Sequence, residues 1–207
     1  MMPVVHVASA GTSWAGTGLV AALLGAGVIG CATVAPRGSA PTAGPATPAR
    51  TVEPGPQAAA ITVPDQVDGF TRSPSLEQQL DVAALAAGVS KSSAGSASDV
   101  RSAVYEQGNL GSSANAKIFM FVGGNLSHRA ADASLVNFER SYPTAHAVSA
   151  GSLAGDAACT ATVANKETVS MCVWFDNDTF GTLVSPTMTT AQLATTMDRV
   201  RPSLERS

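Results

Sequence analysis

Two of the three cysteines of this 207-residue chain are spaced to form a disulfide bond. Cys159 and Cys172 lie in two strand-like segments that flank a two-residue Asn-Lys turn. Counting outwards from that turn, Ala164 opposes Glu167 and the two cysteines oppose each other. Pair types alternate along a hairpin, so this pair is of the non-hydrogen-bonded kind, in which side chains approach most closely. We therefore predict a Cys159–Cys172 disulfide, with two buried free thiols or a metal-binding pair as the alternatives.

A second chemical pattern, from Asp176 to Gly181, is similar to the start of a calcium-binding EF-hand loop. Asp176 and Asp178 supply the D-x-D spacing, and a glycine stands at the sixth position. The pattern then fails, because Phe180 takes a position that needs an oxygen ligand, and Thr187 stands where a bidentate glutamate belongs. We expect a tight turn in which Asp and Asn accept backbone hydrogen bonds. Asp176 and Asp178 are kept as candidate metal ligands, and no cofactor is predicted.

The serine and histidine residues form no recognisable catalytic motif. Ser152 lies in AGSLAG, which lacks the glycines of a nucleophile elbow, and only His128 and His146 follow the N-terminal region as possible bases. The sequence VGGN lacks both the lysine of a phosphate-binding loop and the glycines of a dinucleotide fingerprint. We predict no catalytic residue, and Ser152 with His146 represents the hydrolase alternative.

The elements that carry these residues predict an α+β domain, with a mainly antiparallel sheet of about five to six strands flanked by helices. After a short first strand, the expected order is helix, two strands, helix, four strands, helix. Thr189 and Gln192 form a capping box at the start of the last helix, which Pro202 is expected to end or kink. The strand aromatics are expected to fill the core more readily than a ligand groove: Tyr105, Phe119, Phe121, Trp174 and Phe175.

The first helix is predicted to run from Pro74 to Gly88. Its buried stripe would consist of residues that recur at helical spacing: Leu76, Leu80, Ala83 or Ala84, and Ala87. Gly88 is expected to stop it, since glycine favours helix ends.

The first 36 residues carry no charged side chain, and LVAALLGAGVIG within them has the length of a signal-peptide core. The segment ends in VIGC, residues 28–31, which resembles the lipobox of bacterial lipoproteins. In that family the signal peptidase cuts before the cysteine, which carries a diacylglyceryl group. The resemblance implies that Cys31 is lipidated and becomes the mature N-terminus. An uncleaved membrane helix from Trp14 to Ala35, a conventional secretion signal and an apolar core segment are the alternatives.

A linker follows the leader. Half of the twelve prolines fall within residues 36–60, with Ala, Gly, Ser and Thr between them. This composition has no apolar face to bury, which indicates an extended, disordered segment that reaches on the order of 70 Å. The predicted organisation is a signal peptide or membrane anchor over 1–31, a Pro/Ala-rich linker over 32–60, and one extracytoplasmic domain over 61–207.

The charge pattern excludes one class of partner. The formal net charge is −3, and the twelve basic residues are scattered singly. Nucleic-acid binding needs clustered lysine and arginine to neutralise phosphates. We therefore expect no nucleic-acid partner.

The segments CVWFDNDTFGTLVSP and AQLATTMDRVRPSLE resemble the C-terminal half of uncharacterised exported proteins of high-GC actinobacteria, a likeness that covers about residues 61–206. The element order is also similar to that of PsbP-like sandwiches. Neither resemblance implies an activity. We expect a non-enzymatic module, tethered by its N-terminus to the outer face of the cytoplasmic membrane or secreted, which binds a protein, an envelope component or a small molecule. A secreted hydrolase is the alternative.

Overall fold

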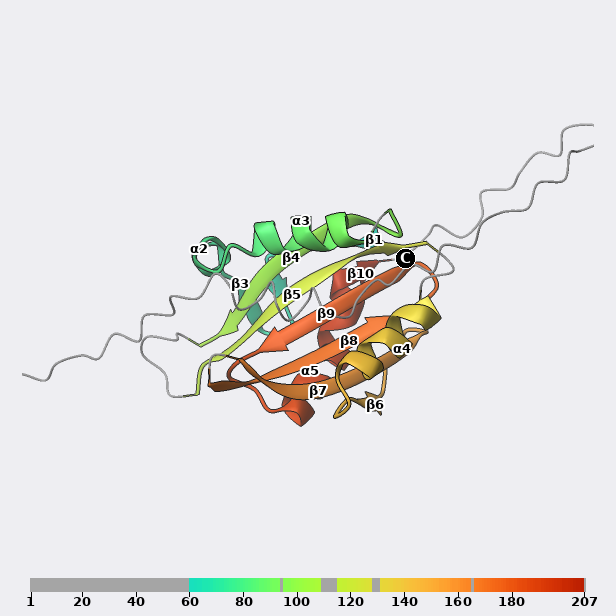
Figure 1. Cartoon of the computed structure of the whole chain (residues 1–207). Coiled ribbons are helices and arrows are strands. Elements are labelled where there is room, and N and C mark those ends of the chain that lie inside the picture. The colour runs from blue at the N-terminus through green and yellow to red at the C-terminus, as the bar shows by residue number, and fades with distance from the viewer. Residues whose placement is uncertain (1–59, 94, 109–114, 128–130, 165, 207) are drawn as a thin grey trace, which may run out of the picture.

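The computed structural model describes residues 60–93, 95–108, 115–127, 131–164 and 166–206. These residues form an α+β domain around one eight-stranded sheet with the order β2-β3-β4-β5-β9-β8-β7-β6 (Figure 1). All pairings within it are antiparallel. The predicted α+β class and mainly antiparallel sheet are confirmed.

The strands of the main sheet are β2 (Gln66–Val67), β3 (Phe70–Arg72), β4 (Ala97–Gln107), β5 (Lys117–Leu126), β6 (His146–Val148), β7 (Asp156–Ala164), β8 (Glu167–Phe175) and β9 (Thr179–Ser185). Two further strands, β1 (Ala60–Ile61) and β10 (Glu205–Arg206), pair with each other. The helices are α2 (Pro74–Gln79), α3 (Val82–Ser92), α4 (Ala131–Ser141) and α5 (Thr190–Leu204).

Helices cover both faces of the sheet, which divides the core in two. Leu85 of α3 and Phe138 of α4 pack with sheet residues in one cluster. Leu193 and Met197 of α5 pack with sheet residues in the other. Figure 1 shows α3 and α4 on one side of the sheet and α5 behind it. Strands buried on both faces in this way have apolar residues at successive positions, as the middle of β5 and most of β8 do.

The sheet has more strands than the expected five to six. The additional strands are β2 and β3, which have two and three residues and lie in the segment where one short first strand was expected. A segment of that length is too short to show an alternating pattern. Asp68 and Gly69 both have positive φ, 43° and 79°, and they form the two-residue turn that pairs β2 with β3.

The single helix predicted from Pro74 to Gly88 is wrong. Two helices, α2 and α3, occupy this region, and Asp81 between them has a left-handed φ of 47°. Because of this break, α2 and α3 do not share one buried stripe, and Ala87 is exposed. Helix α3 also continues past Gly88. The buried residues of α3 are Val82, Leu85, Ala86 and Val89.

The capping box of the last helix is confirmed. The Thr189 hydroxyl accepts a hydrogen bond from the Gln192 backbone N–H at 3.3 Å, and Gln192 Oε1 accepts one from the Thr189 N–H at 3.0 Å. Pro202 does not end the helix, which continues to Leu204. Its buried apolar residues are Leu193, Met197, Val200 and Leu204.

The first and last strands of the described domain lie side by side. Ala60 pairs with Arg206, and Ile61 pairs with Glu205. The Thr62 amide donates to the Leu204 carbonyl at 2.7 Å, which continues this contact by one residue. Figure 1 shows β1 and β10 toward one end of the sheet, and α2 and β3 toward the opposite end.

Candidate functional site

The predicted disulfide is confirmed. Ala164 opposes Glu167 and Cys159 opposes Cys172, as counted from the two-residue turn. The cysteine sulfurs are 2.01 Å apart and the Cα atoms 4.1 Å apart. Both side chains are fully buried in the cluster that α5 covers. The bond therefore joins two neighbouring strands inside the core, and neither of these two cysteines offers a thiol for chemistry.

Replacing both Cys159 and Cys172 with alanine is expected to lower the free energy of unfolding by about 2–4 kcal/mol. The disulfide closes a loop between residues 13 apart in the sequence, so its loss increases the freedom of the unfolded chain. Urea denaturation of the oxidised chain and of the double variant at the same pH measures the difference. Equal stabilities would contradict the assignment of a stabilising role to this bond.

The Asp176 segment forms the tight turn that was expected. Asp176 Oδ1 accepts hydrogen bonds from the backbone N–H groups of Asp178 at 2.8 Å and Thr179 at 2.6 Å. Its Oδ2 atom accepts from the Thr179 hydroxyl at 3.0 Å and from Arg201 at 2.9 Å. In the part of the chain that the structure describes, no three or more His, Cys, Asp or Glu residues are grouped as metal ligands. The Asp176 carboxylate organises a turn and binds an arginine.

That arginine, Arg201, is fully buried. Its Nε atom donates to Glu205 Oε2 at 2.7 Å, and its Nη2 atom donates to Asp176 Oδ2. Nη1 and Nη2 also donate to the carbonyls of Ala150 at 2.8 Å and Ala154 at 2.7 Å, in the loop between β6 and β7. The guanidinium thus joins α5 and β10 to two loops that are distant in the sequence.

One cation faces two carboxylates in this cluster, and the two respond differently. Burial raises the pKa of Glu205, and the neighbouring Asp176 raises it further against the opposite effect of Arg201. Burial also acts to raise the pKa of Asp176, but the interaction with Glu205 and the hydrogen bonds from the turn outweigh it, so that pKa is lowered. Asp176 is therefore the carboxylate that stays ionised, and Glu205 is the one that more readily holds a proton.

Sequence reasoning missed Arg201 and Glu205. The signal for Arg201 was its position one turn after Met197, on the apolar stripe of the last helix. An arginine at such a position requires partners, and these come from segments that the stripe does not identify.

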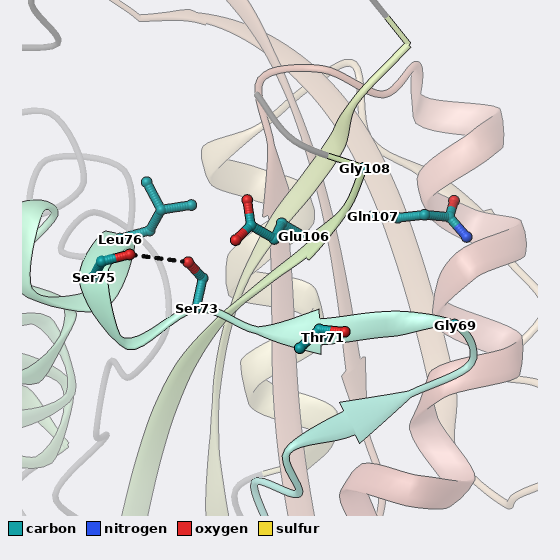
Figure 2. Close-up of a pocket in the computed structure, with 8 residues that line it drawn as sticks. All are labelled: Gly69, Thr71, Ser73, Ser75, Leu76, Glu106, Gln107 and Gly108. Carbon is teal, nitrogen blue, oxygen red and sulfur yellow. Dashed lines mark hydrogen bonds between the residues drawn. The ribbon is translucent and has the colours of Figure 1, made fainter. Parts of the chain in front are cut away.

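An open groove lies between β3, the start of α2 and the end of β4 (Figure 2). Its volume is about 480 Å³. Hydroxyl groups and one carboxylate dominate its lining, which makes it the candidate binding site. The lining residues are Gly69, Thr71, Ser73, Ser75, Leu76, Glu106, Gln107 and Gly108.

The groove carries an unneutralised negative charge. Glu106 opposes Thr71 in the β3–β4 ladder, and its side-chain carboxylate makes no hydrogen bond or ion pair with any residue that the structure describes. The neighbouring cation, Arg72, is already held by both oxygens of Glu77 at 2.6 and 2.9 Å. Figure 2 shows the Glu106 carboxylate facing the hydroxyls of Ser73 and Ser75 across the groove. No pattern in the sequence indicated this site.

The structure does not bring Ser152 and His146, the residues of the hydrolase alternative, together as a catalytic pair. Ser152 is exposed in the turn before β7, and His146 is exposed on β6. Among the described residues, no hydrogen bond links these two side chains. His128 lies outside the described residues. The strand aromatics belong to the core, as expected: Tyr105, Phe119, Phe121 and Trp174 are fully buried, and Phe175 is 2% exposed.

The leader and linker, with the candidate lipidation site Cys31, also lie outside the described residues. Within the described ranges, no helix has both the length and the apolar composition needed to cross a membrane. The predictions for residues 1–59 therefore stay predictions.

Known proteins add no information about the groove. The chain matches no protein-family model, no curated protein and no solved structure. The chemistry of a ligand must therefore be inferred from the lining residues themselves.

Proposed function

We propose that this chain is a non-enzymatic binding module, held at the outer face of the cytoplasmic membrane through its N-terminal region, and that its ligand binds in the groove of Figure 2. The proposal rests mainly on Glu106, a carboxylate that has no partner among the described residues and lies in an open, hydroxyl-lined groove. The groove lies between β3, the start of α2 and the end of β4. Figure 1 shows α2 and β3 toward the end of the sheet opposite β1, the first strand of the described domain. A ligand bound there would be held away from the attachment point.

Three observations support the exported location in this proposal. The Cys159–Cys172 disulfide is typical of an oxidising compartment. The apolar leader with its lipobox-like VIGC supplies a route to the membrane, and the Pro/Ala-rich linker supplies reach. The likeness to exported actinobacterial proteins and to PsbP-like sandwiches belongs to the same proposal and adds no activity to it.

The lining favours a ligand with a cationic amine. An unpaired carboxylate attracts an ammonium or guanidinium group, and charge-assisted hydrogen bonds are stronger than neutral ones. The hydroxyls of Thr71, Ser73 and Ser75 can donate to and accept from neighbouring polar groups of the same ligand. An amino sugar of the cell envelope and a lysine side chain of a partner protein share this chemistry.

Titration of the full chain with glucosamine and with Nα-acetyl-lysine amide tests the proposal. We expect backbone amide NMR shifts at Gly69, Thr71 and Gly108, and binding at least about tenfold weaker in Glu106→Gln, since the acceptor keeps its hydrogen bond but loses its negative charge. The probe that binds with the higher affinity identifies whether the amine comes from an amino sugar or from a lysine side chain. Uncharged N-acetylglucosamine is expected to bind weakly.

The matched control is Glu167→Gln, which removes an exposed carboxylate from β8, outside the groove. This variant is expected to bind both cationic probes as the unmodified chain does. Equal binding by the Glu106→Gln variant, or shifts confined to other surfaces, would exclude the groove as the site.

A further inference from the structure

The Thr179 hydroxyl lies between two carboxylates. Its Oγ1 atom is 2.8 Å from Glu205 Oε1 and 3.0 Å from Asp176 Oδ2. A hydroxyl has one proton, so it can donate to only one of these oxygens. If both carboxylates were ionised, the second would face a lone pair of the hydroxyl at hydrogen-bond distance. A proton on Glu205 removes this conflict, because Glu205 then donates to Thr179 and Thr179 donates to Asp176.

We propose that Glu205 holds a buried proton and that this proton stabilises the pairing of β10 with β1, the first strand of the domain. Glu205 lies in β10 and pairs directly with Ile61 of β1. The adjacent residue, Leu204, accepts the hydrogen bond from the Thr62 amide. Release of the proton to solvent would place a second negative charge in a site where the Glu205 residue is only 7% exposed. The β1–β10 contact is therefore the part of the fold that responds to the proton.

The charges around Glu205 come from two directions. Arg201 approaches from α5, and Asp176 approaches from the turn between β8 and β9. Asp198, one turn before Arg201 on α5, is a further carboxylate that interacts with the same guanidinium. The loop between β6 and β7 contributes backbone carbonyls to Arg201, and β1 contributes no titratable side chain. The buried Arg201 guanidinium thus interacts with three carboxylates, those of Asp176, Asp198 and Glu205.

This arrangement fixes the sign of the pH response. The folded-state pKa of Glu205 is raised above its ordinary value of 4.5 by burial and by Asp176. The stabilisation from the protonated form is fully present below the unfolded-state pKa and is lost as the pH rises through the folded-state pKa. Between these two values the equilibrium for opening β1 from β10 increases by up to about tenfold per pH unit, and above them it levels off.

Hydrogen exchange at the Thr62 amide of the full chain, from about pH 4 to about pH 9 and corrected for base catalysis, tests the proposal. We expect its protection to fall across the titration of Glu205. Glu205→Gln mimics the protonated side chain and is expected to give protection that does not change with pH. The exposed Glu167→Gln variant is expected to keep the pH response of the unmodified chain.

NMR titration of the Glu205 carboxyl carbon in the unmodified chain gives a second readout that does not depend on a variant folding. We expect a midpoint above the ordinary pKa of 4.5. A midpoint at or below that value would overturn the proposal. The same pH response in Glu205→Gln and in the unmodified chain would also overturn it.

Discussion

Replacing Arg201 with methionine is expected to lower the free energy of unfolding by about 3–5 kcal/mol at neutral pH. Methionine fills much of the same volume but removes the cation that Asp176 and Glu205 face, and it leaves the carbonyls of Ala150 and Ala154 without their donor. A buried carboxylate without a counter-charge destabilises a fold more than the loss of a single contact does. Urea denaturation of the full chain measures the effect.

The same helix offers a matched control for this change. Arg199 forms an ion pair with Asp68, but the two side chains are 55% and 32% exposed. Exposed pairs contribute little, so Arg199→Met is expected to cost at most about 1 kcal/mol. A loss in Arg201→Met no larger than the loss in Arg199→Met would contradict the structural role assigned to the buried guanidinium.

Replacing Gly181 with alanine is expected to cost about 3 kcal/mol or more, because the new methyl group has no space. A Cβ atom at this position would overlap with Cζ2 and Cη2 of the Trp174 ring. That ring is fully buried and stacks on Phe121 at a centroid distance of 6.0 Å and an interplanar angle of 9°, so it cannot move aside freely. The overlap outweighs the gain in strand propensity from glycine to alanine, which is about 0.5–1 kcal/mol. Thermal and urea unfolding measure the loss.

Gly88→Ala is the matched control for the same chemical change. Gly88 lies in α3, and nothing lies within 4 Å of a Cβ atom built on it. Alanine is favoured over glycine in a helix, so this variant is expected to gain about 0.5–1 kcal/mol. If Gly181→Ala proved as stable as the unmodified chain, the close packing of the Trp174 ring on β9 would be disproved.

Local rules predicted the features that depend on neighbouring residues. The two-residue turn after Ala164 fixes the register of β7 and β8, and the register fixes the pairing of Cys159 with Cys172. The capping box at Thr189 likewise depends on residues three apart. Both predictions were confirmed because few alternatives satisfy the same spacing.

Features that depend on distant segments were not predicted. Asp81 adopts a left-handed conformation, which no local pattern required, and the helix stripe predicted across it was wrong. The position of Arg201 on the apolar stripe of the last helix indicates burial, but its partners come from the turn after β8 and the loop before β7, which the stripe does not identify. The groove combines Thr71 with Glu106, which are 35 positions apart in the sequence. Its composition becomes visible only when β3 pairs with β4.

Because Ala60 pairs with Arg206, the two ends of the described domain lie next to each other. Domains whose two ends lie side by side tolerate circular permutation and insertion into surface loops of other proteins. A short peptide between these two residues would convert the domain into a ring that could be opened at another exposed turn. A second domain fused after Arg206 would emerge beside the linker, at the end of the sheet away from the groove.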